Sequence, residues 1–487
     1  MSPAGTSWDN ISNELAAAPS NRSASQAAYS PELNATILFG GYNGAGGNYP
    51  LGDTWEYTNV GWTELSASGG PAPRWGGAMV YFPAMKSLVL FGGRNDTTFF
   101  NDTWTYNETG WHQLPTSAAP SPRYYFGLVF DPALGELVLF GGGIGNIPAG
   151  TFTGFVFYND TWTFDGSNWL NITSSSGLAP PGRLMRSQMA YDAVDGYVVL
   201  AGGFTFVSPG SGGPCPFVTF DTAWASTWTF GTDGWSELLG PNASPPPGIG
   251  TIWYDSQANV TLYYEGMQNG SAGGCQVSGD EVWGFSAGGW TLVSEANITA
   301  PEARFLSLFF DDPATHQQIL FGGELVASAS ESYGVYGHDT WAYAPTWVTF
   351  EAQGQLPSGY EWQVSVADAV RKSSGTSVLF VVPPGNYTYE FGVINAGHTL
   401  IPVSGGELAL VRAPEVVSVS IPSGLVHGSG PSPLLSPDLA AAILGGTVGV
   451  LIAGAWTIGA GVRSRRLERE DGGRLLRSLE QQVRPKK

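Results

Sequence analysis

Charged side chains are scarce in this sequence: Asp, Glu, Lys and Arg together make up 12% of its 487 residues. Basic residues are the rarer kind, with 20 Lys and Arg against 40 Asp and Glu, so the formal net charge at pH 7 is −20. Proteins that bind nucleic acid need basic surfaces that neutralise phosphates. A chain this acidic is therefore not expected to have a nucleic-acid partner.

Histidine and cysteine are also rare, with five and two copies. The histidines, His112, His316, His338, His398 and His427, do not recur at a spacing typical of metal ligands. No Ser, His and Asp combination stands out as a hydrolase motif either. We therefore assign no catalytic residue, no metal site and no cofactor.

Glycine and aromatic residues are abundant, in contrast. The chain contains 68 Gly, and Phe, Trp and Tyr make up 13% of it. Together with many Asn, Ser, Thr and Pro, this composition is typical of an all-β protein with many turns.

One pattern recurs six times: Pro-x-x-Arg, an alternating stretch, a run ending in Gly-Gly, a variable loop, Asp-Thr-Trp, and a further Trp. The doublets lie at Gly40 and Gly41, Gly92 and Gly93, Gly141 and Gly142, Gly202 and Gly203, and Gly322 and Gly323, with Glu265 and Gly266 as a degenerate copy. The tryptophans that follow them are Trp55, Trp104, Trp162, Trp228, Trp283 and Trp341. Each copy contains four short apolar or alternating runs, which predicts four strands per copy.

This repeat resembles the kelch family of β-propellers, of the type found in the central domain of galactose oxidase, from Trp8 to about Tyr343. The resemblance implies a six-bladed propeller over residues 1–345. The start of the chain resembles the fourth strand of the third copy, so Trp8 to Ile11 is expected to be the outer strand of the last blade. The alternative is a seven-bladed ring whose first part lies upstream of this sequence.

The repeated residues have expected structural roles. The glycines allow backbone conformations that a β-carbon would block, and the tryptophans are expected to pack between blades. Two alternatives are open for the arginines of the Pro-x-x-Arg boxes. They could form a ring that binds an anion or a sugar carboxylate, or they could hold the blades together by bonding to backbone carbonyls and neighbouring acidic residues. These arginines are Arg22, Arg74, Arg123, Arg183 and Arg304, and Ile249 replaces the arginine in the fifth copy.

The variable loops after the doublets connect second to third strands and are expected to share one face of the ring. Binding function usually lies on loops held by a rigid scaffold, so this face is the predicted site. Cys215 and Cys275 lie in two neighbouring loops of it. We expect them to form a disulfide.

Short alternating runs with Pro-Gly turns over residues 346–421 predict a small β-sandwich. It resembles the immunoglobulin-like modules of archaeal surface proteins, in turns such as Leu-Pro-Ser-Gly and Pro-Gly-Asn-Tyr-Thr-Tyr. Residues 422–438, rich in Pro, Ser and Gly, are expected to form a stalk.

Residues 439–462 form a run of 24 without a charge, which is long enough to cross a bilayer as a helix. Residues 463–487 carry nine Lys and Arg against four Asp and Glu, so this basic tail is expected in the cytoplasm and the region before the helix outside. The lipid bilayer is then one partner. The opening residues "MSPAGTSWDN" do not have the pattern of a signal segment.

Asn-x-Ser/Thr sequons are frequent before the helix and absent after it, which favours an exterior glycoprotein. The thirteen are Asn10, Asn21, Asn34, Asn95, Asn101, Asn107, Asn159, Asn171, Asn242, Asn259, Asn269, Asn297 and Asn386. We select eight as glycosylation candidates: Asn95, Asn101, Asn107, Asn159, Asn171, Asn259, Asn297 and Asn386.

The sequence thus predicts a membrane-anchored surface protein whose kelch-like propeller binds a glycan or a protein on its loop face. Two alternatives stay open: an extracellular carbohydrate-active hydrolase or oxidase, and a purely structural protein of the cell envelope. Carboxylates converging in a loop-face pocket would favour the enzyme.

Overall fold

The computed structural model describes residues 8–44, 50–65, 69–145, 156–177, 180, 189–203, 226–239, 243, 248–256, 259–268, 281–286, 289–294, 301–302, 304–312, 317–325, 336–343, 346–354, 356, 359–366, 369–373, 377–382, 385–394, 400–410 and 415–421. Strands form nearly all of the regular structure there, besides the short 3-10 helices η1 (Ser12–Glu14) and η2 (Pro83–Met85). The predicted all-β class is confirmed. No helix within these ranges is both long and apolar enough to cross a membrane.

Several predicted features lie outside these ranges and stay predictions. They are Arg183, Cys215, Cys275, Asn297, the 422–438 stalk, the 439–462 membrane segment and the 463–487 tail.

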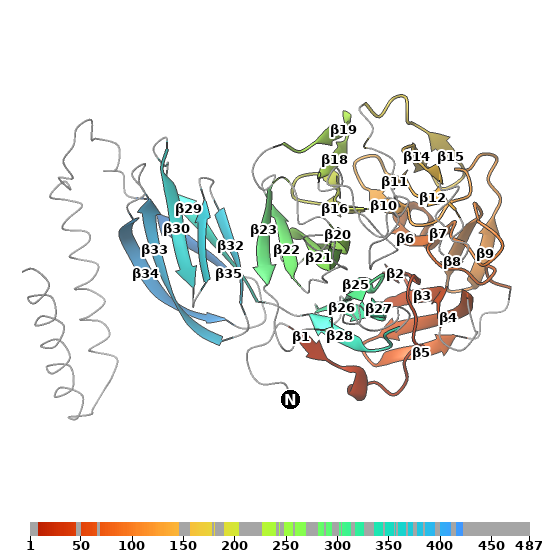
Figure 1. The fold of residues 1–487 in the computed structure, drawn as a ribbon, viewed down its shortest axis with the longest axis horizontal. Coiled ribbons are helices and arrows are strands. Elements are labelled where there is room, and N and C mark those ends of the chain that lie inside the picture. Colours follow the sequence, from red (N-terminus) through yellow and green to blue (C-terminus); the bar gives the residue numbers. More distant parts are fainter. Residues whose placement is uncertain are drawn as a thin grey trace, which may run out of the picture. The chain divides into compact units, whose positions relative to one another are not determined.

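Six four-stranded antiparallel sheets correspond to the six repeats (Figure 1). The first three sheets pair their strands in chain order: β2 (Gln26–Ser30), β3 (Ala35–Tyr42), β4 (Pro50–Thr58) and β5 (Gly61–Leu65); β6 (Ala78–Phe82), β7 (Ser87–Phe91), β8 (Thr103–Asn107) and β9 (Gly110–Leu114); β10 (Gly127–Asp131), β11 (Glu136–Phe140), β14 (Thr161–Phe164) and β15 (Trp169–Asn171). The short strands β12 (Gly143–Ile144) and β13 (Val156–Phe157) pair within the loop that precedes β14.

The fourth and fifth sheets follow the same order, and the sixth takes its last strand from the start of the chain. Their strands are β16 (Met189–Asp192), β17 (Tyr197–Leu200), β18 (Trp228–Gly231) and β19 (Gly234–Glu237); β20 (Gly248–Asp255), β21 (Val260–Gln268), β22 (Val282–Ser286) and β23 (Gly289–Ser294); β25 (Leu308–Asp312), β26 (Gln317–Phe321), β28 (Thr340–Tyr343) and β1 (Trp8–Asn10). Two further short strands, β24 (Arg304–Phe305) and β27 (Glu324–Leu325), pair with each other.

The first strands of the six sheets contact one another in the order β2, β6, β10, β16, β20 and β25, and β25 contacts β2. Figure 1 shows the sheets around a common centre. β1 pairs with β28, with Trp8 opposite Tyr343 and Asn10 opposite Trp341. The first described strand of the chain therefore completes the sheet formed by the last repeat.

The chain divides into two compact units: Met1–Thr349 with Leu379–Asn386 and Ala409–Glu415, and Phe350–Val378 with Tyr387–Leu408 and Val416–Lys487. Beyond the six sheets, two more sheets have the strand orders β32-β29-β35 and β31-β30-β33-β34. Their strands are β29 (Thr346–Gln353), β30 (Glu361–Val366), β31 (Ala369–Ser373), β32 (Ser377–Val382), β33 (Gly385–Ile394), β34 (Leu400–Leu410) and β35 (Glu415–Ser420). The rings of Phe350 and Tyr389, one from each sheet, lie 5.0 Å apart and join the two layers.

The Gly-Gly doublets lie at close contacts between neighbouring sheets. Gly40 has a φ of 61°, and a β-carbon there would lie 2.5 Å from the carbonyl oxygen of Arg74 in the next sheet. The N–H of Gly41 donates to that same oxygen at 2.9 Å. The second glycines of the second and sixth sheets make the equivalent bond, also at 2.9 Å, to Arg123 and Arg22. The doublets are therefore required by an inter-sheet contact that has no room for a side chain.

A second inter-sheet bond joins outer-strand tryptophans to the threonine of the Asp-Thr-Trp box in the preceding sheet. The Trp111 Nε1 group donates to Thr54 Oγ1 at 3.0 Å. The equivalent bonds, of 2.8–3.3 Å, join Trp169 to Thr103, Trp235 to Thr161, Trp290 to Thr227 and Trp62 to Thr340. The last of these joins the first sheet to the sixth. At the interface between the fifth and sixth sheets, Val282 occupies the threonine position and packs in one cluster with Trp8.

The two sets of tryptophans differ in how deeply they are buried. The outer-strand set is deeply buried, from Trp290 at 1% exposure to Trp111 at 7%. Of the set predicted to pack between blades, Trp55 and Trp228 are buried, whereas the other four are only half-buried. Both sets recur with the same spacing, since each tryptophan of the outer-strand set lies seven residues after a tryptophan of the first set, but the outer-strand set is the more fully buried.

Candidate functional site

Four of the predicted arginines form one repeated structure, which we call the lock: an arginine, the aspartate of the same sheet and the tryptophan two residues after it. In the first sheet, Arg22 donates to both carboxylate oxygens of Asp53, at 2.8 and 2.6 Å, and to the carbonyl of Gly40 at 3.1 Å. The Trp55 Nε1 group donates to the same carboxylate at 2.7 Å. The other three locks are Arg74, Asp102 and Trp104; Arg123, Asp160 and Trp162; and Arg304, Asp339 and Trp341.

The lock arginines are at most 1% exposed, while their aspartates keep 22–27% exposure. Burial opposes ionisation of these four carboxyls, but the hydrogen bonds and charge of the arginine, helped by the tryptophan, lower their pKa below the usual value. Because each guanidinium is buried and directed at protein acceptors, the geometry favours the structural alternative for Arg22, Arg74, Arg123 and Arg304 over anion binding. Arg183 lies outside the described residues.

The fourth and fifth sheets depart from the lock. Ser226 takes the position of the aspartate in the fourth sheet, and its Oγ accepts from Trp228 at 3.0 Å. In the fifth, Glu281 accepts from Trp283 at 3.2 Å, and Ile249 stands where the arginine would be. Among the described residues, the buried ion pair therefore occurs in the first, second, third and sixth sheets and not in the fourth and fifth.

The lock fixes the segment that follows it. Each lock arginine bonds to the carbonyl of the first glycine of its own doublet at 2.9–3.1 Å. The residue after the arginine then pairs with the residue after the doublet: Ser23 with Tyr42, Trp75 with Arg94, Tyr124 with Gly143, and Phe305 with Glu324. These eight positions lie where second strands end, on the predicted loop face, and they vary while the lock stays constant.

The residue after each of these pairs adopts an unusual backbone conformation. Ala24, Gly76, Tyr125 and Leu306 have φ values of 54–68°. Their peptide groups link neighbouring sheets: the N–H of Ala24 donates to Leu306, Gly76 donates to Ala24, and Tyr125 donates to Gly76. A positive φ is uncommon for residues with side chains and is often found at functional sites. The residues with positive φ therefore directly follow the variable paired positions.

Aromatic side chains from four sheets form a continuous series here, which we call the aromatic arc: Tyr336, Tyr42, Trp75, Tyr124, Tyr125 and Phe99. Ring centroids are 5.9 Å apart between Tyr336 and Tyr42, and 5.5 Å apart between Tyr42 and Trp75. Beyond them, Trp75 lies 5.4 Å from Tyr124, which contacts both Tyr125 at 4.7 Å and Phe99 at 5.7 Å. Tyr42, Trp75 and Phe99 are half-buried, so parts of their rings reach the surface.

Arg94 lies at one end of the arc, with its guanidinium carbon 4.7 Å from the Phe99 ring centroid, 5.1 Å from that of Trp75 and 5.6 Å from that of Tyr124. Its Nε donates to the Asn95 carbonyl and its Nη1 to the Gly145 carbonyl, both at 3.0 Å. Burial raises the pKa of Tyr124 to about 12, although the Arg94 charge opposes the rise. The cation is therefore held in a fixed orientation by three rings and two carbonyls.

Glu324 lies at the other end of the arc. Burial raises the pKa of its carboxyl to about 7. Burial also raises the pKa of the paired Tyr336, and the charges of Glu324 and Tyr42 add to that shift. The arc thus runs from an acidic to a basic group, with aromatic surface between them.

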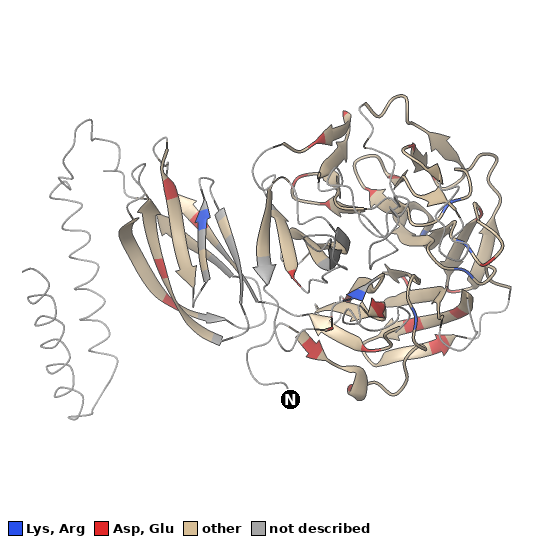
Figure 2. Ribbon diagram, in the orientation of Figure 1, with Lys and Arg blue, Asp and Glu red and all other residues tan. Residues whose placement is uncertain are grey.

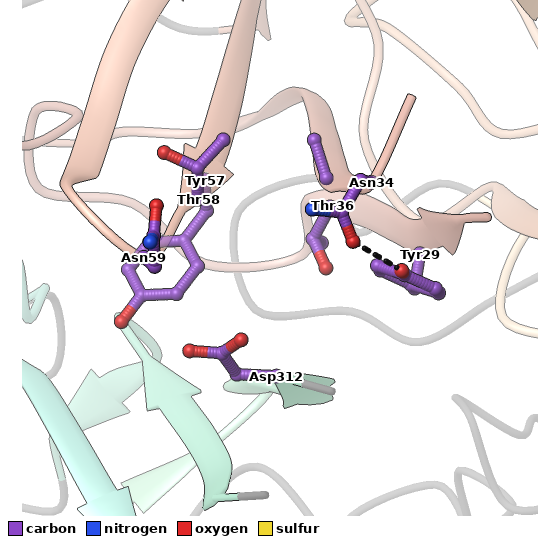
Figure 3. Close-up of a pocket in the computed structure, with 8 residues that line it drawn as sticks. Tyr29, Asn34, Thr36, Tyr57, Thr58, Asn59 and Asp312 are labelled. Atoms are coloured by element: carbon purple, nitrogen blue, oxygen red, sulfur yellow. Dashed lines mark hydrogen bonds between the residues drawn. The ribbon is translucent and has the colours of Figure 1, made fainter. Parts of the chain in front are cut away.

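A separate hollow lies near the opposite end of the first strands, between the first and sixth sheets (Figure 3). The Tyr29 hydroxyl donates to Asn34 at 3.0 Å, and the Tyr57 hydroxyl and Asp312 carboxylate point toward each other. The cavity measures about 10 Å³, room for one water molecule at most. It is too small for an organic ligand.

The glycosylation candidates that the structure places lie on the surface of the sheets. Asn101, Asn159, Asn171, Asn259 and Asn386 are exposed, whereas Asn95 and Asn107 are half-buried and bond to a neighbouring threonine. Within the described ranges no group of three or more His, Cys, Asp or Glu could hold a metal ion.

Sequence reasoning predicted the loop face but missed the residues of the arc. The position of Trp75, Arg94, Tyr124 and Glu324 in the repeat would have indicated them. Each directly follows the recurring Arg or Gly-Gly of its copy, yet the residue type at that position changes from copy to copy. Variation next to constant scaffold residues indicates positions that serve recognition.

Comparison with known families matches residues 3–203 to the KLHDC2/KLHL20/DRC7 Kelch-repeats domain. Kelch repeats are therefore present in this part of the chain. Among solved structures, the chain is similar to one titled "Structure of YjhT", with 17% identity, 67% of this chain and 95% of that chain covered, and a TM-score of 0.46. No curated protein matches the chain.

Proposed function

We propose that this chain is a membrane-anchored recognition protein whose propeller binds a glycan or a protein through the aromatic arc. The arc itself is the observation that carries the proposal. It presents Tyr, Trp and Arg side chains, the residue types that contribute most to binding at protein interfaces. Tyr and Trp also offer large contact areas at a low cost in side-chain entropy.

The rigidity of the surroundings supports this assignment. Locks, glycine contacts and the backbone bonds of Ala24, Gly76 and Tyr125 fix the segments that carry the arc. A surface fixed before binding loses less entropy when the ligand arrives.

We further infer that the six sheets form a closed six-bladed propeller. The contact between β25 and β2, the pairing of β1 with β28, and the Trp62 bond to Thr340 support closure without an additional blade.

The membrane anchor in this proposal is residues 439–462, with 463–487 in the cytoplasm and the sheets outside. The uncharged run and the basic residues after it support the anchor and its orientation. The same exterior location would allow glycosylation at the sequons and a disulfide between Cys215 and Cys275.

Binding of the full-length chain to a glycan array and to a panel of surface proteins tests the recognition function. Wild type is expected to select a small set of ligands, and Trp75→Ala to lose at least about tenfold in affinity by removing the central ring of the arc. Leu170→Ala is the control, because this leucine is 63% exposed on β15, away from the arc. Turnover of a glycoside or alcohol in place of binding would contradict the proposal.

The anchor has its own test. After expression of the full-length chain, alkaline carbonate washing is expected to leave it in the membrane pellet, and deletion of residues 439–462 to release it. Release of the intact chain by carbonate would refute the anchor and leave the recognition site unaffected.

A further inference from the structure

We infer that the ligand of the aromatic arc carries an anionic group, a carboxylate or a sulfate, which Arg94 receives. This inference rests on the proposed recognition function and specifies the chemistry of its ligand. Glycans and acidic peptides both offer such groups, and the experiment below distinguishes them.

The first observation is which basic residues in the sheets have a carboxylate partner. Six are described between residues 8 and 343: four are lock arginines, Lys86 follows η2 in the turn between β6 and β7, and the sixth is Arg94. All four ion pairs among the described residues belong to the locks. In that part of the chain, Arg94 is the basic residue on the loop face that has no carboxylate partner.

The second observation is how Arg94 is held. Its Nε and Nη1 donate to two backbone carbonyl oxygens, and its side chain also interacts with the Tyr124 hydroxyl, so its polar partners are neutral groups. The three rings around it restrict its rotation. A guanidinium fixed in this way loses little entropy when it binds a carboxylate or sulfate, and such charge-assisted bonds are stronger than neutral ones.

The third observation is the charge of the surroundings. Figure 2 marks acidic residues across the six sheets and few basic ones. A cation retained on a loop face of an acidic protein provides local complementarity to an anion and discriminates against neutral ligands. The exposed ring surface of Trp75 and Phe99 beside it favours an anionic group attached to an apolar or sugar face.

The test compares matched acidic and neutral probes on the full-length chain by calorimetry. One arm uses oligogalacturonate against its methyl ester; the other uses a short Phe-containing peptide with glutamates against its glutamine counterpart. We expect one acidic probe to bind about tenfold or more tightly than its neutral partner, and Arg94→Gln to remove that preference. The arm that responds identifies the source of the anion. Lys86→Gln makes the same charge change away from the arc and should have no effect.

Failure of the inference is distinct from failure of the proposed function. If array ligands bind and Trp75→Ala weakens them, but neither acidic probe is preferred or Arg94→Gln changes nothing, the anionic class is wrong while recognition stands. If neither probes nor array ligands bind, both are wrong.

Chemical modification gives a second readout that requires no high-affinity ligand. Phenylglyoxal followed by peptide mapping is expected to modify half-buried Arg94 and to spare Arg22, Arg74, Arg123 and Arg304, which are at most 1% exposed. The preferred acidic probe should protect Arg94 from modification. Modification of Arg94 that the preferred probe leaves unchanged would overturn the inference.

Discussion

The second sheet and the fifth sheet are copies of one repeat held together in different ways. In the second, Arg74, Asp102 and Trp104 form a buried ion pair with an indole bond. In the fifth, Ile249 replaces the arginine, Glu281 replaces the aspartate, and Val282 replaces the inter-sheet threonine. The interface between the fifth and sixth sheets is aromatic instead, with Trp253 stacked on Phe309 at 4.2 Å.

The comparison distinguishes two roles of the repeat: forming a four-stranded sheet, and positioning the segments that carry the arc. A sheet can form without the lock, so the fold does not require the ion pair in every copy. The arc, however, is built from the first, second, third and sixth sheets, which all have it. We therefore attribute to the lock the positioning of the segments that carry the arc, in addition to stability.

The largest effect is expected from Trp111→Ala, which removes both a buried indole and its bond to Thr54. Loss of a buried tryptophan typically costs about 3–5 kcal/mol of unfolding free energy. Denaturant unfolding should show that loss, a smaller loss for half-buried Trp104→Ala, and almost none for exposed His112→Ala. A larger loss at Trp104 would reverse the ranking.

Arg74→Met makes the second sheet resemble the fifth and leaves Asp102 without its counter-charge. Breaking a buried pair by removing one partner costs about 3 kcal/mol, and we expect that loss in chemical unfolding. The double variant Arg74→Met with Asp102→Leu should recover part of it, because no unpaired charge remains. An unchanged unfolding midpoint for the single variant would show that the lock does not stabilise the sheet.

Thr103→Val gives the interface between the second and third sheets the residue that Val282 supplies between the fifth and sixth. It removes the acceptor of the Trp169 indole and should cost about 1–2 kcal/mol. Thr63→Val on β5 is the control, since this threonine is exposed. Equal melting temperatures for Thr103→Val and wild type would mean that the bond is not a stabilising one.

The smallest expected effect is a dependence of the folding stability on pH in the acid range. Because the lock carboxyls have a lowered pKa in the folded protein, their stabilisation is present above the unfolded value of about 3.9 and is lost as pH falls through the lowered values. Unfolding midpoints measured between pH 5 and 2 should fall less steeply for the Arg74 and Asp102 double variant than for wild type. A steeper fall would contradict the assignment.

Much of the scaffold was predictable because its residues recur. The Gly-Gly doublets and the Pro-x-x-Arg boxes each indicated one structural position, and the family comparison confirms kelch repeats over residues 3–203. Strand limits were less predictable. The first strand of the second sheet does not follow Arg74 directly but begins at Ala78, because Gly76 has a φ of 68° and Trp75 pairs with Arg94 instead.

The functional residues were harder to predict, since their partners come from other copies. Nothing near Arg94 in the sequence indicates that Gly145, 51 positions later, accepts its hydrogen bond. Even within one copy the partner can be distant in the sequence, since the buried Arg22 pairs with Asp53, 31 positions away.

Hydrogen–deuterium exchange of the full-length chain, with and without a ligand selected on the array, tests the central claim most directly. If the arc is the recognition site, the ligand will slow exchange around Tyr42, Trp75, Arg94 and Tyr124 and leave the fourth and fifth sheets unchanged. Protection confined to the fourth and fifth sheets, with none at the arc, would contradict it.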